Sequence, residues 1–335
     1  MRNLLVVAPE GADIFLEGLA NVAAREGWNL HRHAGPPGEV IGSEALRQAD
    51  VLLTSGALRC DRSLFEAAQR LRAVISLFIG TEAIDEAAAT ACGVVVCNGQ
   101  IPENYEGVAE GTILLALAAM YGLLTKERLL REGKSAPLTL PTRMLWRKTV
   151  GIVGFGMIAQ AVARRLSAWD VTLLVNTRTP RPLPDHVQPA DLDTLLRRSD
   201  VVLLLTDLNK ETRHLIDAER LALLKPSAVL VNTSRGAVVD EAALVRWAET
   251  NPDALLALDV FETEPLPLDS PLRQLPNAVL TPHAIAGTRE AVLAIRRAAV
   301  ENVAAAFEGV PTRVRNAAVL PRWRERHGHA PETGA

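Results

Sequence analysis

Short runs of apolar residues recur along the chain, separated by stretches in which apolar positions have helical spacing. The runs are rich in Val and Leu and do not alternate with polar residues, which is typical of parallel strands buried on both faces. Two series of strands are predicted, the first at Leu4–Ala8, Val51–Thr54, Ala73–Ser76 and Val94–Cys97, the second at Thr149–Val153, Val171–Val175, Val201–Leu205, Val229–Asn232, Leu255–Leu258 and Ala278–Leu280. Helices are predicted between them, among others at Asp61–Arg70, Met157–Ser167 and Asp240–Thr250. The alternation predicts an α/β fold of doubly wound parallel sheets.

The pattern changes at both ends of the second series. A long apolar helix begins near Gly99–Glu103, and a helix predicted at Gly287–Phe307 follows the last strand and could return the chain to the first unit. Two units are therefore expected. Leu138–Thr142 is predicted to be a loop, and the polar residues after Pro321 are expected to be mobile.

Composition and charge narrow the function classes. The 335 residues are 48% hydrophobic with a formal net charge of −3, so a large core is expected and neither nucleic acid nor a membrane is an expected partner. The most apolar run, Gly111–Leu124, is shorter than the ~20 residues of a membrane span and predicts a buried helix. Met1 leads into a strand without a targeting pattern. Cys60, Cys92 and Cys97 lack the spacing of a metal or redox pair, which predicts free thiols, no metal site and a cytoplasmic location.

A glycine-rich turn follows the strand at Thr149–Val153. Gly154 would allow a tight turn, and Gly156 would let the main chain approach a pyrophosphate at the start of the helix that contains Met157 and Ile158. Ala159, an accepted variant, takes the place of the third glycine. The turn predicts a dinucleotide site, and an ordinary strand-to-helix turn is the alternative.

The end of the next strand indicates which dinucleotide binds. An NAD site usually has an acid there, whereas this chain has Thr177, Arg178 and Arg181 in the stretch after Asn176. A guanidinium can hold a 2′-phosphate that a carboxylate would repel. The sequence therefore predicts that NADP(H) is preferred, with NAD(H) as the other cofactor; the alternative is a solvated basic loop.

Three ionisable residues farther along fit the reduction of a 2-oxo acid. Arg235 would bind the substrate's negative charge and polarise its carbonyl, His283 would donate the proton, and Glu264 would keep the histidine charged. Each has another interpretation by itself: a loop-tying arginine, a surface acid and a structural histidine. Their order, downstream of a cofactor turn, favours catalysis.

Several stretches resemble the D-isomer-specific 2-hydroxyacid dehydrogenase family over roughly residues 52–316. The matching motifs are Ile79–Asp85, Gly107–Glu110, Gly151–Ile158, Asn232–Glu241, Leu258–Phe261, Glu264–Pro267 and Thr281–His283. The resemblance implies a flavodoxin-like substrate-binding domain of residues 1–100 plus 289–335, a Rossmann dinucleotide-binding domain of residues 101–288 and an active site in the cleft between them.

The resemblance also implies site residues and an assembly. A substrate loop of Phe78, Ile79 and Gly80 would act together with Arg235 and His283. The cofactor would also be contacted by Thr206, Thr233 and Asp259, the last near the nicotinamide carboxamide. Family members are commonly homodimers, and the cofactor loop is most similar to that of NADPH-using glyoxylate and hydroxypyruvate reductases.

The chain departs from the family pattern at four places. Phe78 replaces a glycine of the substrate loop, Leu205–Asp207 replaces a His-x-Pro motif, and Ile285 and Arg147 each replace a glycine. The leading hypothesis is an NADP-linked oxidoreductase of a small 2-oxo/2-hydroxy acid similar to glyoxylate or hydroxypyruvate. A dinucleotide-sensing corepressor or scaffold and a phosphite-oxidising enzyme are the alternatives. Formate oxidation is disfavoured because such enzymes pair the histidine with a glutamine.

Overall fold

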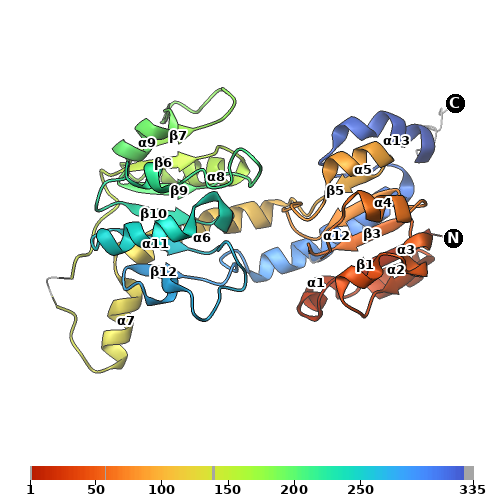
Figure 1. Cartoon of the computed structure of the whole chain (residues 1–335), viewed down its shortest axis with the longest axis horizontal. Coiled ribbons are helices and arrows are strands. Elements are labelled where there is room, and N and C mark those ends of the chain that lie inside the picture. Colours follow the sequence, from red (N-terminus) through yellow and green to blue (C-terminus); the bar gives the residue numbers. More distant parts are fainter. Residues whose placement is uncertain (1, 57, 138–139, 328–335) are drawn as a thin grey trace. The chain divides into compact units, whose positions relative to one another are not determined.

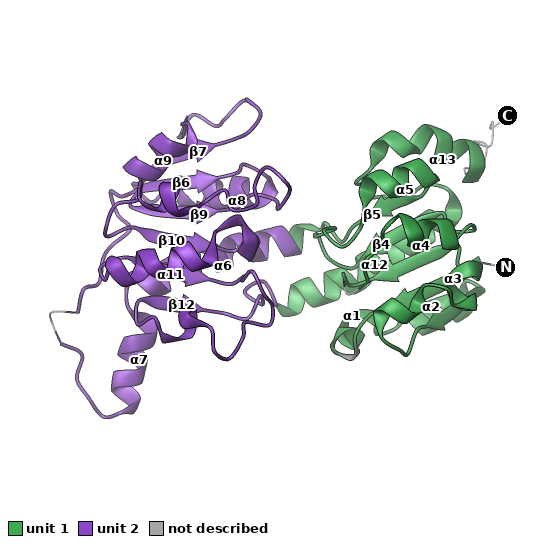
Figure 2. Ribbon diagram, in the orientation of Figure 1, with its two compact units in different colours: residues 1–103, 288–335 green, residues 104–287 purple. Residues whose placement is uncertain are grey.

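A computed structural model describes residues 2–56, 58–137 and 140–327. The chain divides into two compact units, residues 1–103 with 288–335 (unit 1) and residues 104–287 (unit 2) (Figure 2). Each unit contains one parallel sheet, and each is described by itself.

Unit 1 is a five-stranded parallel sheet with strand order β2-β1-β3-β4-β5 (Figure 1). The strands are β1 (Arg2–Val7), β2 (Trp28–Arg32), β3 (Val51–Thr54), β4 (Ala73–Ser76) and β5 (Val95–Cys97). This is the flavodoxin-like order. The α-helices are α1 (Asp13–Leu16), α2 (Leu19–Arg25), α3 (Glu44–Gln48), α4 (Arg62–Ala67), α5 (Glu86–Cys92), α12 (Arg289–Glu308) and α13 (Leu320–His327). Short 3-10 helices lie at Glu10–Ala12, Pro37–Val40 and Ala317–Val319.

Both faces of this sheet are covered because neighbouring strand residues point to opposite sides. Leu4 and Val6 pack with α2 and α12, whereas Leu5 and Val7 pack with α3, α4 and α5. The return of the chain through α12 therefore completes one of the two faces of the N-terminal sheet.

Unit 2 is a seven-stranded parallel sheet with strand order β12-β11-β10-β9-β6-β7-β8. The strands are β6 (Thr149–Val153), β7 (Thr172–Asn176), β8 (Val187–Pro189), β9 (Val201–Leu204), β10 (Val229–Asn232), β11 (Leu255–Leu258) and β12 (Ala278–Leu280). Counted within the unit, the order is the Rossmann order 3-2-1-4-5-6 with one strand added, so the predicted fold class is confirmed.

Helices lie on both faces of this second sheet. Residues of α6 and α8 pack on one face, and residues of α9, α10 and α11 pack on the other. The helices are α6 (Pro102–Met120), which begins in unit 1, then α7 (Leu123–Arg131), α8 (Met157–Leu166), α9 (Leu192–Arg198), α10 (Ala218–Leu221) and α11 (Glu241–Thr250). Short 3-10 helices lie at Gly236–Val238 and Pro271–Gln274.

The apolar run expected to form one helix is divided. α6 ends at Met120 and α7 begins at Leu123, because Gly122 between them takes a left-handed conformation with φ of 58°. Across the described residues, no single helix is long and apolar enough to cross a membrane; α6 and α7 would meet that test only as a pair bent by 61°.

Two edge strands and one helix were not predicted. β2 and β8 lie at sheet edges and are largely exposed, so they lack the continuous apolar runs of the central strands. The expectation of a mobile segment after Pro321 is wrong for residues 322–327, which belong to α13. Trp323, 0% exposed, anchors that helix and donates a 2.6 Å hydrogen bond from Nε1 to the Arg72 carbonyl. One buried residue in a polar segment gives no periodic signal. Of the predicted loop, Leu138 and Thr139 lie outside the described residues.

Candidate active site

The glycine turn lies between β6 and α8, at the point where the strand order of unit 2 reverses. Gly154 has a φ of 93°, and a Cβ built on it would lie 2.5 Å from the Leu205 carbonyl oxygen, so only glycine fits. A Cβ on Gly156 would have no neighbour within 4 Å, which leaves this side of the turn open. Met157 begins α8, and Gly156 supplies no side-chain cap. The open turn and the helix start fit a dinucleotide pyrophosphate.

Two arginines lie after β7, beside this turn. Arg178 Nη1 is 2.9 Å from Glu211 Oε2, and Arg181 Nη1 donates a 2.6 Å hydrogen bond to the Phe155 carbonyl. Thr177 uses its hydroxyl within the loop, at 3.0 Å from the Thr179 carbonyl. The basic segment is thus folded against the glycine turn through Arg181, while Arg178 already has an anionic partner.

Asn232 shapes the turn that presents Arg235. This residue is 1% exposed; its Oδ1 accepts hydrogen bonds from the amide and the hydroxyl of Ser234, and its Nδ2 donates to the Arg235 carbonyl at 3.0 Å. The hydroxyls of Thr233 and Thr112 are 2.7 Å apart, which ties the turn to α6. These buried contacts fix the main chain from which Arg235 projects.

A close main-chain approach brings this turn against the segment that carries Glu264. A Cβ built on Gly236 would lie 1.8 Å from the Phe261 carbonyl carbon, so a larger residue cannot fit without displacing the backbone. Glu264 Oε1 accepts a 3.0 Å hydrogen bond from the Phe261 amide. Gly236 therefore sets how near Arg235 and Glu264 lie.

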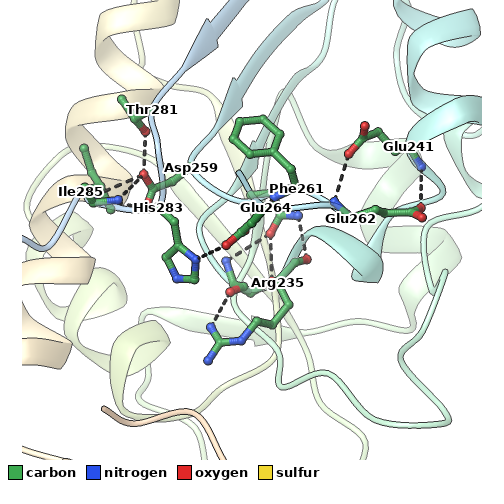
Figure 3. A network of polar contacts seen from close by, with 12 residues as sticks. Arg235, Glu241, Asp259, Phe261, Glu262, Glu264, Thr281, His283 and Ile285 are labelled. Carbon is green, nitrogen blue, oxygen red and sulfur yellow. Dashed lines mark hydrogen bonds and ion pairs between the residues drawn. The ribbon is translucent and has the colours of Figure 1, made fainter. Parts of the chain in front are cut away.

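His283 follows β12 and faces Glu264 (Figure 3). Its Nδ1 is 2.7 Å from Glu264 Oε2, and its φ of 51° is unusual for a residue with a side chain. Asp259 stabilises this conformation. The Asp259 carbonyl accepts the His283 amide at 2.7 Å, and its Oδ1 accepts the Thr281 hydroxyl at 2.7 Å and the Ala284 amide at 3.0 Å. Asp259, 3% exposed, thus holds the histidine turn on both sides.

Ile285, which departs from the family pattern, packs against α6. A Cβ on Gly111 would lie 2.4 Å from its Cγ1, and Gly107, one turn earlier, is close to Ala286. Two glycines on one face of α6 therefore make room for the isoleucine after the histidine turn.

The His283–Glu264 pair shifts both ionisations. The hydrogen bond to Glu264 raises the pKa of His283 above 6.5, and burial of the ring opposes this rise. The negative charges of Glu264 and Asp259 also raise the pKa of His283, whereas the positive charge of Arg235 lowers it. Burial by itself would raise the pKa of Glu264, but the hydrogen bonds from His283 and Phe261, with the charges of His283 and Arg235, hold it below 4.5. Each residue thus favours the charged form of the other.

The candidate residues of unit 2 lie at the carboxyl ends of its parallel strands. Each residue follows the end of one strand, and this is the side on which such sheets bind ligands. Along the chain they are Gly154 to Ile158 after β6, Thr177 and Arg178 after β7, Thr206 after β9, Thr233 and Arg235 after β10, Asp259 and Glu264 after β11, and His283 after β12. Among the described residues, no cluster of three or more His, Cys, Asp or Glu side chains could hold a metal ion.

Phe78, Ile79 and Gly80 belong to unit 1. The Phe78 ring packs edge-on against Phe15, with centroids 5.2 Å apart. Ser76 Oγ donates to the Gly80 carbonyl at 2.9 Å, and Asn98 Nδ2 donates to the Ile79 carbonyl at 2.8 Å. The loop is therefore held by polar contacts within its own unit.

Sequence reasoning gave no site role to Asn232, Thr281, Glu241 or Glu262. Asn232 and Thr281 adjoin predicted residues in the same motifs, which was the available signal. The two glutamates lie 21 residues apart, and only the fold shows that they meet.

Comparison with known proteins supports the same family along most of the chain. The model of the NAD-binding domain of D-isomer specific 2-hydroxyacid dehydrogenases matches residues 113–284. A glyoxylate reductase of Thermofilum pendens is 37% identical over 296 residues, which is 85% of this chain and 86% of the relative. A glyoxylate/hydroxypyruvate reductase B of Escherichia fergusonii is 35% identical over 80% of this chain and 84% of the relative.

A solved structure agrees with these relatives. It is an NADPH-dependent glyoxylate/hydroxypyruvate reductase from Sinorhizobium meliloti in complex with NADP and malonate, with a TM-score of 0.84 and 29% identity, covering 96% of this chain and 98% of that one. The parallel-sheet units, the glycine turn and these similarities together show that the chain belongs to the D-isomer specific 2-hydroxyacid dehydrogenase family and is a nicotinamide-dependent oxidoreductase of 2-hydroxy acids.

Proposed function

We propose that the protein reduces a small 2-oxo acid such as glyoxylate or hydroxypyruvate, with NADP(H) as the preferred cofactor and NAD(H) as the weaker one. The observation that carries the proposal is the hydrogen bond between His283 and Glu264. The charge of Arg235 affects the pKa of both residues, and all three follow carboxyl ends of strands in the sheet that also bears the glycine turn. A dinucleotide whose pyrophosphate is held at that turn would supply a hydride from its nicotinamide ring to the carbonyl carbon.

His283 provides the proton in this scheme. Nδ1 faces Glu264, so Nε2, on the opposite side of the ring, hands its proton to the carbonyl oxygen. Glu264 favours the protonated imidazole and fixes its orientation. In the oxidative direction the neutral imidazole accepts the proton from the 2-hydroxyl group.

Arg235 binds the substrate carboxylate and polarises the carbonyl. A guanidinium offers a carboxylate two parallel hydrogen-bond donors. At ~4 Å and an effective dielectric constant near 20, one such charge pair contributes about 4 kcal/mol of Coulomb energy. Only the part that increases as charge develops on the oxygen accelerates the reaction.

Arg178 and Arg181 support a preference for NADP(H). Both follow β7, where NAD sites usually have an acid, and Arg181 already contacts the glycine turn. We propose that Arg178 leaves Glu211 and binds the 2′-phosphate when the cofactor binds. We further propose that the cofactor contacts four residues at the carboxyl ends of the strands, namely Thr177, Thr206, Thr233 and Asp259.

We assign the substrate-binding role to residues 1–100 plus 289–335, through the loop of Phe78, Ile79 and Gly80, and the cofactor-binding role to residues 101–288. A screen of NADPH oxidation with glyoxylate, hydroxypyruvate, pyruvate and longer 2-oxo acids tests the function. Turnover with the small acids is expected. Tight dinucleotide binding without turnover would instead indicate a sensing role. Reduction of NAD(P)+ by phosphite, assayed separately, together with no turnover of the 2-oxo acids would indicate the other alternative.

We propose that the protein is a homodimer. Large apolar side chains lie exposed around α6 and α7, namely Leu114, Tyr121, Leu123, Leu124, Leu130, Met144 and Trp146, with Leu130 78% exposed. Apolar exposure of this kind marks association surfaces. Light scattering should give twice the chain mass, and aspartate at Leu124 and Leu130 should give monomers. The free thiols of Cys60, Cys92 and Cys97 are compatible with the proposed cytoplasmic location.

A further inference from the structure

Two glutamates beside the His283–Glu264 pair bind each other's main chain. The Glu241 amide donates to Glu262 Oε1 at 3.0 Å, and the Glu262 amide donates to Glu241 Oε2 at 3.0 Å (Figure 3). Glu262 lies two residues before Glu264, and Glu241 is the first residue of α11. The reciprocal pair therefore ties a helix end to the turn that carries the proposed partner of His283.

This pair of glutamates satisfies two main-chain donors, the Glu241 amide at the start of α11 and the Glu262 amide on the turn before Glu264. The Glu241 amide is among the first amides of α11, which have no partner inside the helix, and a carboxylate is favourable there. On the turn, Glu264 accepts the Phe261 amide and Glu241 accepts the next one, that of Glu262. Two successive amides before Glu264 are thus each held by a carboxylate.

His214 completes the arrangement. Its Nε2 lies 3.0 Å from Glu262 Oε1, at an angle outside hydrogen-bond geometry. The His214 amide donates to the Ala237 carbonyl at 2.8 Å, which places the ring against the segment after Arg235. Burial, together with the neighbouring charge of Glu262, raises the pKa of Glu241.

We propose that Glu241, Glu262 and His214, here called the carboxylate clamp, are positioning residues that hold Glu264 in register with His283. This proposal rests on the proposed function for its catalytic consequence only. The clamp acts by fixing the backbone from Phe261 to Glu264. A looser backbone lengthens the Glu264–His283 hydrogen bond and weakens its effect on the imidazole.

The charged groups that act on His283 are Glu264, Arg235 and Asp259. Alanine and glutamine at Glu241 or Glu262 remove the same charge, so a shift in His283 titration that only the alanine variants show reports the position of Glu264. This makes the imidazole a reporter that a merely stabilising role of the clamp would leave unmoved.

The test compares Glu241→Ala and Glu262→Ala with their matched controls, Glu241→Gln and Glu262→Gln. The glutamine side chain keeps a carbonyl oxygen that can accept the same amide. NMR of isotope-labelled histidine side chains, with the His283 signal identified by its loss in His283→Gln, should give a lower pKa for His283 in both alanine variants and the wild-type pKa in both glutamine variants. Reductive kcat should fall roughly tenfold in the alanine variants at unchanged KM for NADPH.

Glu262→Asp adds a variant that keeps the charge on a shorter stem and is expected to shift His283 in the same direction, should an alanine variant not fold. The proposal would be overturned if His283 kept its wild-type pKa in the alanine and aspartate variants. It would also be overturned if the pKa of His283 fell as far in the glutamine variants as in the alanine variants. The titration needs no substrate, so absence of 2-oxo acid reduction by the wild-type protein would refute the proposed function and leave the clamp testable.

Discussion

Glu264→Gln isolates the charge of the residue paired with His283. Glutamine has nearly the same shape, and its carbonyl can still accept from the imidazole Nδ1, now 2.7 Å from Glu264 Oε2. What the substitution removes is the negative charge that favours the imidazolium. The pKa of His283 should therefore fall toward its ordinary value near 6.5.

The magnitude follows from the separation and exposure of the pair. Charges ~4 Å apart interact by about 1 kcal/mol in water and about 4 kcal/mol at an effective dielectric constant of 20. The two side chains are 46% and 35% exposed, so solvent screens the pair and a value of about 1–2 kcal/mol is appropriate. This corresponds to roughly a fivefold to thirtyfold loss of protonated His283 at a pH above its pKa.

The assay is the pH profile of kcat/KM in both directions. Reduction needs protonated His283, so its rate is full below the pKa and falls as pH rises through it; in Glu264→Gln this fall should occur at lower pH. Oxidation needs the neutral imidazole, so its rate rises as pH passes through the pKa of His283. In Glu264→Gln this rise should also occur at lower pH. Identical profiles in the variant and the wild-type protein would refute the assignment of Glu264 as the charge partner of His283.

Four further substitutions test other parts of the site. His283→Ala should lower reductive kcat by about 10²–10⁴-fold while NADPH affinity, measured by fluorescence titration, stays within about twofold; wild-type rates would refute the mechanism. Arg235→Lys keeps a charge but loses the planar fork, and kcat/KM should fall by roughly 10²-fold, whereas an unchanged value would exclude bidentate binding. Arg178→Gln should weaken NADPH by about tenfold in the same titration and leave NADH unchanged; tighter binding of NADH than of NADPH by the wild-type protein would contradict the preference. Gly236→Ala places a methyl group against the Phe261 carbonyl and should lower the free energy of unfolding by about 3 kcal/mol or more in urea titration, whereas a wild-type midpoint would mean that the two turns move apart without cost.

The central strands were predictable because each is an uninterrupted apolar run, as at Val201–Leu204 and Val229–Asn232. The edge strands β2 and β8 were not, because exposure on one side removes that signal. α13 was missed for a related reason, since its attachment depends on the one buried side chain of Trp323.

The sequence by itself determined the fold class, the glycine turn and the three ionisable residues, since each depends on residue type and order within a short segment. Only the tertiary structure decided what surrounds them. The close approach of Gly236 to Phe261, the grip of Asp259 on the histidine turn and the meeting of Glu241 with Glu262 join segments about 20 residues or more apart. Local patterns record which face of an element is buried, whereas these contacts depend on how strands pair across the sheet, so no single segment encodes them.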